Sequence, residues 1–136
     1  MDIAAGLDIA YSGMTAQAER IKIITQNIAN AGSMASQPGQ DPYRRQMISF
    51  KSVYDKTVGG NVVKVAGVTG DQTPFTQKLD PSNPVADAQG YVSMPNVNPI
   101  IEQADLREAQ RSYEANLSAM DLVKSVAMQT ISYIKA

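Results

Sequence analysis

The stretch IAAGLDIAYSGMTAQAERIKIITQNIANA, residues 3–31, decides the fold. It contains no proline, and its apolar residues recur at alternating steps of three and four for about four heptads. This spacing places them on one face of a helix, with a single glutamine among them. We therefore predict a long helix over residues 1–31, whose packing face consists of Ile3, Leu7, Ala10, Met14, Gln17, Ile21, Ile24 and Ile28.

The other end of the chain, residues 98–136, follows the same helical period. Asn98 is a favourable N-cap residue, and Pro99 suits the first helical position. Acidic residues lie early in this segment and lysines late, as the helix dipole favours. The predicted packing face of this second helix consists of Leu106, Ala109, Tyr113, Leu117, Met120, Val123, Ala127, Ile131 and Ile134.

Residues 32–97 hold every proline except Pro99 and most of the glycines. Ser33–Asp41 is predicted to be a mobile loop, and Asp80–Asn98 to be extended and rich in turns. Between them, alternating or β-branched runs predict two to four short strands over Tyr43–Val53, Asn61–Thr69 and Phe75–Leu79. The predicted fold class is therefore α+β, with two long terminal helices paired as a coiled-coil-like hairpin and a small irregular β-rich middle region.

The composition excludes several classes of function. The 136 residues include 12 basic and 13 acidic side chains, with no cysteine and no histidine. Disulfides and thiolate sites are therefore excluded, and the commonest neutral-pH base and metal ligand is missing. The balanced charge argues against a nucleic-acid binder, and no apolar run approaches the ~20 residues that span a bilayer. We expect no cofactor, no nucleic acid and no membrane insertion.

Two helices with one apolar face each imply partners. The middle region is expected to cover little of either helix, so the two apolar faces should pack on each other. Away from that face, residues 1–30 carry few charges and many small residues, whereas a solvent-facing helix surface is normally charged. We therefore expect the first helix to be contacted on more than one side, against the alternative of an ordinary two-helix hairpin with a bland surface.

Two charged pairs are interpreted as structural. Glu102 and Asp105 lie one turn apart and could be imagined as an acid/base pair, but carboxylates near a helix N-terminus more commonly favour the helix dipole. Arg44 and Arg45 form the one adjacent basic pair, which is more typical of a solvated loop than of a phosphate clamp. Neither pair gives positive evidence for an enzyme.

Two further pairs are candidates for contacts. Asn27 and Asn30 stand at the end of the first helix, where they either bond to neighbouring groups or simply terminate the helix. Tyr113 and Asn116 lie three apart on one helix face. We expect Tyr113 to pack and Asn116 to make a polar contact between helices or subunits, rather than to be plain surface.

Stretches at both ends of the chain resemble signatures of the bacterial flagellar rod and hook (axial) proteins. SGMTAQ at 12–17, continuing through Arg20-Ile21 to NIANA at 27–31, is similar to the N-terminal signature, and RSYEAN at 111–116 to the C-terminal one. PYRR at 42–45 and GYVSMPNVN at 90–98 further resemble the proximal rod members of that family. The resemblance runs essentially end to end, and the chain lacks the large inserted domains of the longer distal rod and hook members.

The resemblance implies a structural, non-enzymatic subunit of the proximal rod of the flagellar basal body. In such a subunit the helices of residues 1–31 and 98–136 form the inner tube around the export channel, and residues 32–97 lie outside them. Export by the flagellar type III apparatus would deliver the chain to the periplasm, and Met1-Asp2-Ile3-Ala4 shows no basic n-region of a cleaved signal peptide. The implied partners are other copies of the chain, other rod proteins, the rod-to-membrane-ring adaptor and the export apparatus, in a rod that transmits motor torque.

These expectations define two sets of contact residues. The expected helix-pairing and subunit-interface residues are Leu7, Met14, Gln17, Ile21, Ile24, Asn27, Ile28, Asn30, Leu106, Tyr113, Asn116, Leu117, Met120, Val123, Ala127 and Ile131. The expected outer-region contacts are Tyr43, Arg44, Tyr91, Pro95 and Asn96. The competing functions are a freestanding coiled-coil secreted adaptor and, with less support, a carboxylate-based peptidoglycan hydrolase.

Overall fold

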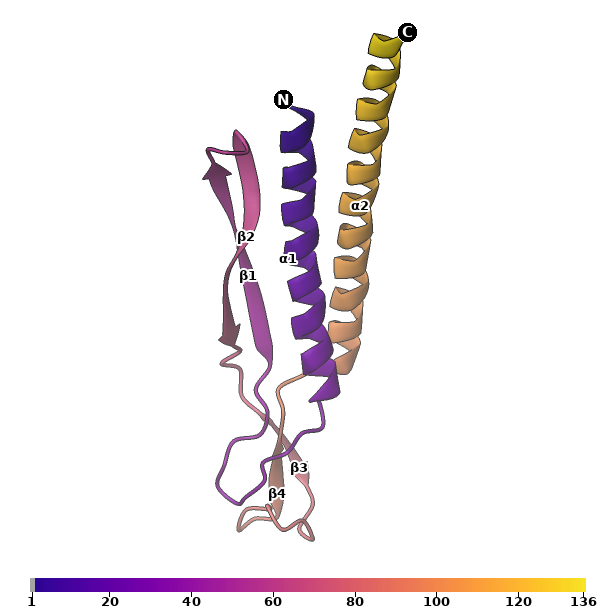
Figure 1. Cartoon of the computed structure of the whole chain (residues 1–136). Helices are drawn as coiled ribbons and strands as arrows, with labels where there is room; N and C mark the ends of the chain where they lie inside the picture. Colours follow the sequence, from indigo (N-terminus) through magenta and orange to yellow (C-terminus); the bar gives the residue numbers. More distant parts are fainter. Residues whose placement is uncertain (1) are drawn as a thin grey trace. The chain divides into compact units, whose positions relative to one another are not determined.

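The computed structural model describes residues 2–136, in which two long helices flank four strands along the chain (Figure 1). The elements are α1 (Ile3–Ala29), β1 (Gln46–Asp55), β2 (Gly60–Gly70), β3 (Thr76–Leu79), β4 (Tyr91–Met94) and α2 (Pro99–Lys135). β1 and β2 form one two-stranded sheet, and β3 and β4 form another. The predicted α+β class is confirmed, while coiled-coil pairing of the helices stays a prediction.

Local hydrogen bonds explain where the helices begin and end. The Asn98 side chain accepts a 3.1 Å hydrogen bond from the N–H of Ile100, which confirms the predicted N-cap of α2. At the end of α1, Asn30 donates to the carbonyl of Gln26 at 2.9 Å and accepts from the Ser33 hydroxyl at 3.1 Å. The backbone N–H of Asn30 donates to the same carbonyl at 3.0 Å, so Asn30 closes the last turn of α1 with both its backbone and its side chain.

Glycines with positive φ shape the two turns that the strands require. Gly59, at φ 70°, closes the loop between β1 and β2, and its N–H donates to the carbonyl of Asp55 at 2.8 Å. Gly90, at φ 84°, directly precedes β4. β4 lies inside the segment predicted to be only extended and turn-rich; it forms a strand because it pairs antiparallel with β3, with Leu79 opposite Tyr91.

The chain forms two compact units, and each combines segments distant in sequence. The first unit contains the residues up to Ile21, Ser49–Gly67 and Arg107–Ala136. The second unit contains Lys22–Ile48 and Val68–Leu106. The functional division into tube-forming helices and an outer region stays a prediction.

In the first unit α1 lies between α2 and the β1–β2 hairpin (Figure 1). The buried apolar residues here are small: three alanines of α1, one valine of β2 and one alanine of α2, namely Ala5, Ala10, Ala16, Val62 and Ala109. Small side chains allow elements to approach closely, so this core is thin.

The hairpin covers the side of α1 that faces away from α2. The Ser12 hydroxyl accepts a 3.1 Å hydrogen bond from the N–H of Val63, and a Cβ added to Gly60 would lie 3.0 Å from Cδ1 of Ile9. The expectation that the middle region covers little of either helix is therefore wrong for this face. The uncharged surface around Ile9 and Ser12 exists because the chain's own hairpin packs on it.

The core of the second unit mixes apolar and polar groups. Ile23, Ile24 and Val92 are buried, and so are the side chains of Asn27 and Glu102. Buried polar groups require hydrogen-bond partners, since an unsatisfied one costs about 1–3 kcal/mol. The partners of Asn27 and Glu102 define a buried polar site.

Candidate functional site

The predicted pairing residues of the first unit follow the contact between α1 and α2. Gly6 lies against Val123 and Gly13 against Asn116, so the two helices run antiparallel in this unit. Most of the predicted residues are partly buried: Leu7, Met14, Gln17, Ile21, Tyr113, Met120, Val123 and Ala127. Leu117 and Ile131 differ, because they are 42% and 52% exposed. Whether these residues also contact other subunits stays a prediction.

Gly13 leaves room for the Asn116 side chain between the two helices. A Cβ added to Gly13 would lie 2.8 Å from Oδ1 of Asn116, whereas one added to Gly6 would lie 3.6 Å from the nearest methyl of Val123. The Asn116 amide donates to the carbonyl of Ser112 in its own helix at 3.0 Å. Asn116 therefore packs over the backbone of Gly13 and bonds within α2.

α2 extends past the N-terminal end of α1 in the first unit (Figure 1). Val126 lies beside Ile3, at the first residue of α1, so the residues of α2 beyond it face no part of α1. This explains why Ile134, which belongs to the predicted packing face, is 79% exposed. Among residues 2–136 nothing covers the end of that face.

Apolar side chains outside the predicted packing face are also exposed in the C-terminal part of α2. We define the α2 apolar surface as Leu122, Val126, Met128, Ile131, Tyr133 and Ile134, all of them exposed. An apolar groove of about 270 Å³ adjoins it, between Ile3 and Gly6 of α1 and Leu122 and Val126 of α2. Apolar surface gathered in this way is typical of a protein–protein contact.

Gln17 is the polar member of the α1 packing face. Its Oε1 atom is buried and accepts no hydrogen bond within the described part of the chain, residues 2–136. A buried carbonyl oxygen without a donor is destabilising by about 1–3 kcal/mol. Gln17 therefore has capacity for a donor that the chain itself does not supply.

In the second unit Asn27 uses its full hydrogen-bonding capacity. Its Nδ2 donates to the carbonyl of Gln46 at 2.8 Å and to Glu102 at 3.1 Å. Its Oδ1 accepts from the Tyr43 hydroxyl and from the N–H of Gln46, each at 2.9 Å. Two donors and two lone pairs are thus satisfied in a residue that is 1% exposed. Of the two alternatives for Asn27, the structure shows the bonding one.

Arg45 connects three carboxylates around this amide. Its Nε donates to Glu102, its Nη1 lies 3.3 Å from Asp71, and its Nη2 lies 3.8 Å from Asp105. Glu102 is 1% exposed and the Arg45 side chain 23%. The interpretation of the arginine pair as a solvated loop is therefore wrong, because a buried carboxylate requires a cationic partner. Glu102 likewise is a buried ion-pair partner rather than a surface residue favoured by the helix dipole.

Asn96 holds the backbone next to Arg45 in place. Its Oδ1 accepts the N–H of Arg45 at 2.8 Å, and its Nδ2 donates to the carbonyls of Asp71 and Thr73 at 3.0 Å each. Asn27 and Asn96 thus fix the adjacent backbone groups of Gln46 and Arg45. We define the polar cluster as Asn27, Tyr43, Arg45, Asp71, Asn96 and Glu102.

The remaining expected outer-region residues lie around the polar cluster. The Arg44 guanidinium lies 4.2 Å from the centre of the Phe75 ring and donates to the carbonyl of Asp71 at 2.8 Å. Pro95 is buried, and Tyr91 is 42% exposed. Arg44, Tyr43 and Asn96 thus bond within the second unit, and their contacts with other subunits stay predictions. Of the other predicted residues of this unit, Ile24 is buried, and Ile28, Asn30 and Leu106 are partly buried.

The environment of the cluster shifts the pKa values of Tyr43 and Asp71. Burial, and then the negative charge of Glu102, raises the pKa of the Tyr43 phenol, so the hydroxyl remains a donor to Asn27. The N–H of Thr73, with Arg45 as a smaller cause, lowers the pKa of Asp71. Both shifts favour the protonation states that the hydrogen bonds require.

Sequence reasoning assigned no contact role to Arg45, Asp71 and Glu102. The sequence contains one signal for these contacts. Asp41 is the only acidic residue near the arginine pair, so the pair needs carboxylates from distant parts of the sequence if it is buried. The partners themselves lie 26 and 57 positions away from Arg45, so their identity follows only from the fold.

Residues 2–136 contain no group of three acidic side chains placed to hold a metal ion. None of the described helices is long and apolar enough to cross a bilayer. The polar cluster therefore holds its carboxylates with arginine and amide groups.

Comparisons with known proteins identify the family. The family model described as "Flagella basal body rod protein" matches residues 7–31, and "Flagellar basal body rod FlgEFG protein C-terminal" matches residues 88–132. The flagellar basal-body rod protein FlgC of Agrobacterium fabrum is 45% identical over 134 residues, covering 98% of this chain and 96% of that protein. FlgC of Salmonella typhimurium is 40% identical (92% of each chain), and FlgC of Bacillus subtilis is 37% identical (92% of this chain, 93% of that one). The chain therefore belongs to the FlgC family of flagellar basal-body rod proteins.

Proposed function

We propose that the chain is a structural subunit of the proximal rod of the flagellar basal body, where it assembles with other rod proteins. Its similarity to rod proteins extends over nearly its whole length. A role in assembly needs surfaces that pack rather than groups that react.

The α2 apolar surface is the observation that carries the proposal. Ile134 and Tyr133 are 79% and 81% exposed, and Met128 is 72% exposed, in the part of α2 that extends past the start of α1. Burying an aliphatic or aromatic side chain of this size stabilises a contact by about 1.5–3 kcal/mol. Neighbouring subunits that cover this surface would thus supply a large part of the assembly free energy.

The terminal helices are proposed to form the wall of the inner tube. The alanines and glycines of α1 allow close helix contacts. Residues 32–97 then form the outer part, in which the polar cluster holds the loops that meet other subunits.

The finer partners follow from this placement. Other copies of the chain, adjacent rod proteins and the rod-to-membrane-ring adaptor would contact its outer faces in the periplasm, after export by the flagellar type III apparatus. The rod would transmit motor torque through these contacts. Contacts that transmit torque must hold tightly and keep a defined geometry. The α2 apolar surface supplies buried apolar area, and the hydrogen-bonded polar cluster supplies the defined geometry.

Complementation of a strain that lacks its own copy of the gene tests the proposal. The chain should restore swimming and complete hook–basal bodies, and purified basal bodies should contain it. The variant Ile134→Asp should be exported in normal amount but should abolish hook–basal bodies, because it places a charge on the α2 apolar surface. Normal hook–basal bodies in the uncomplemented strain would contradict the proposed function.

A further inference from the structure

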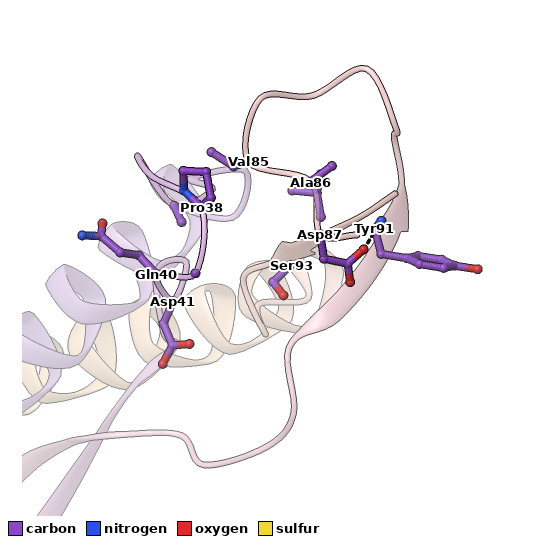
Figure 2. Close-up of a pocket in the computed structure, with 11 residues that line it drawn as sticks. Pro38, Gln40, Asp41, Val85, Ala86, Asp87, Tyr91 and Ser93 are labelled. Carbon is purple, nitrogen blue, oxygen red and sulfur yellow. Dashed lines mark hydrogen bonds between the residues drawn. The ribbon is translucent and has the colours of Figure 1, made fainter. Parts of the chain in front are cut away.

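A groove in the second unit takes no part in the contacts described above (Figure 2). It has a volume of about 230 Å³ and lies among the loop around Gln40, the residues around Ala86 and the first residues of β4. The surrounding segments, residues 33–42 and 80–90, contain Asp41, Asp80 and Asp87 but no lysine or arginine. Arg44 lies 3.9 Å from Asp41, so three carboxylates and one arginine leave the region of the groove with a net negative charge, and the groove walls include Pro38 and Val85.

Two carboxylates, Asp41 and Asp87, line the groove. Oδ1 of Asp87 accepts the backbone N–H groups of Gln89 at 2.9 Å and Tyr91 at 2.8 Å, the second of which is drawn in Figure 2. This carboxylate is already ordered, so binding a cation does not require it to lose further freedom. The Asp41 side chain is 79% exposed, and its basic neighbour Arg44 is 3.9 Å away.

The β1–β2 hairpin of the first unit carries the opposite charge. Ser49–Gly67 contains three lysines and a single acidic residue, Asp55. Lys56 is the first residue of the loop between the strands; it is exposed and forms no ion pair within residues 2–136. Tyr54 beside it is 63% exposed, so the hairpin also offers apolar area to the groove walls.

We propose that the acidic groove of one copy receives the β1–β2 loop of a second copy of this chain, with Lys56 between Asp41 and Asp87. The inference rests on the proposed function, because it names one of the contacts by which the rod would assemble. It joins the first unit of one copy to the second unit of the next, so the two surfaces differ. Such a heterologous contact repeats head to tail, into a ring or an open helical array, rather than into a two-fold symmetric dimer.

The charges in this contact determine its register more than its strength. Exposed ion pairs contribute only about 0–1 kcal/mol each, whereas charge complementarity excludes wrong partners and orients the right one. The α2 apolar surface supplies the affinity. The acidic groove then selects which neighbour the hairpin meets.

Cysteine cross-linking between two co-produced variants tests the contact directly. The chain contains no cysteine, so any new thiol gives a specific signal. Lys56→Cys and Asp41→Cys are produced together in the deletion strain, and isolated hook–basal bodies are treated with a short bis-maleimide. Because each chain has a single thiol, a product can form only between chains. A second pair, Thr57→Cys with Gln40→Cys, keeps all charges. It replaces the first pair if rods with the first pair do not assemble.

The expected result is a cross-linked dimer of this chain with either pair, and none when one member is replaced by Lys51→Cys, which lies on the same hairpin outside the loop. If rods assemble but neither cysteine pair gives a cross-linked dimer, the contact is overturned while the proposed function stays intact. A product between Lys56→Cys and a different rod protein would also overturn it. Loss of function in the complementation experiment would instead overturn the proposed function itself.

A charge exchange provides an independent measurement. Lys56→Asp or Asp41→Lys alone should reduce the number of hook–basal bodies several-fold, because like charges then meet in the groove. The double variant Lys56→Asp/Asp41→Lys should restore the number, and Lys51→Asp should leave it near the unsubstituted value. Failure of the double variant to improve on either single variant would overturn the proposal.

Discussion

The side-chain amide of Asn27 donates a 3.1 Å hydrogen bond to the carboxylate of Glu102, and each residue is only 1% exposed. Asn27 belongs to α1 and Glu102 to the first turn of α2, so this bond joins the two helices inside the second unit. Apolar faces alone allow helices to slide along each other by a turn, whereas a buried polar pair has one satisfied arrangement. The polar cluster therefore defines the helix register in this unit.

The first prediction concerns Asn27 itself. Asn27→Ala should destabilise the chain by roughly 2–4 kcal/mol, because it leaves the N–H and carbonyl of Gln46 and the hydroxyl of Tyr43 without partners. Asn30→Ala is the matched control and should cost at most about 1 kcal/mol, since Asn30 bonds only near the helix end. Urea unfolding of the purified chain, followed by circular dichroism, measures both. Equal losses would contradict a special role for Asn27.

The second prediction separates the Glu102 ion pair from a general effect of helix charge. Glu102→Gln keeps the shape but leaves Arg45 without its buried partner, so it should cost about 3 kcal/mol. Glu108→Gln changes the same charge at an exposed position of the same helix and should be within about 0.5 kcal/mol of the unsubstituted chain. The free energy of unfolding in urea again decides. A loss at Glu102 no greater than that at Glu108 would show that the ion pair is dispensable.

The third prediction concerns the helix contact at Gly13. Gly6→Ala has room for its Cβ and should stabilise α1 by about 0.5–1 kcal/mol. Gly13→Ala places a methyl group against the Asn116 amide, so the same gain should be offset or reversed. Adding Asn116→Ala should recover the gain at Gly13. Thermal unfolding of the three variants measures the coupling, and equal melting temperatures for Gly6→Ala and Gly13→Ala would argue against close packing.

The fourth prediction concerns acid stability. Backbone N–H groups, of Thr57 and Val58 for Asp55 and of Thr73 for Asp71, lower the pKa of these carboxyls in the folded chain. Because the pKa of each carboxyl is lower in the folded chain, its ionised form stabilises the fold. This stabilisation is present above the pKa of the unfolded chain, about 3.9, and is lost as the pH falls through the pKa of the folded chain. Asp55→Asn/Asp71→Asn should therefore reduce the loss of melting temperature between about pH 5 and pH 2. An unchanged pH dependence would contradict this assignment.

Both helices could be predicted from the sequence, because their signals are local. The period of the apolar residues gives α1 and α2 within a few residues, and the N-cap at Asn98 is confirmed by its bond to Ile100. The axial-protein resemblance is likewise confirmed by relatives that match nearly the whole chain.

The polar cluster could not be predicted, because its bonds depend on tertiary structure. Arg45, Asp71 and Glu102 are far apart in sequence, and each alone is typical of a surface residue. β4 was missed for the same reason: four residues form a strand only when β3 lies beside them. The hairpin that covers Ile9 and Ser12 was missed as a partner of α1, so the uncharged side of that helix was assigned to other subunits.

A density map of the intact basal body at side-chain resolution tests the central claim most directly. The claim is that neighbouring subunits bury the α2 apolar surface, which the chain leaves exposed. The predicted result is that α2 lies in the tube wall, with Ile131, Tyr133 and Ile134 packed against adjacent helices. A map in which the chain is present in the rod but these three side chains face solvent would contradict the account.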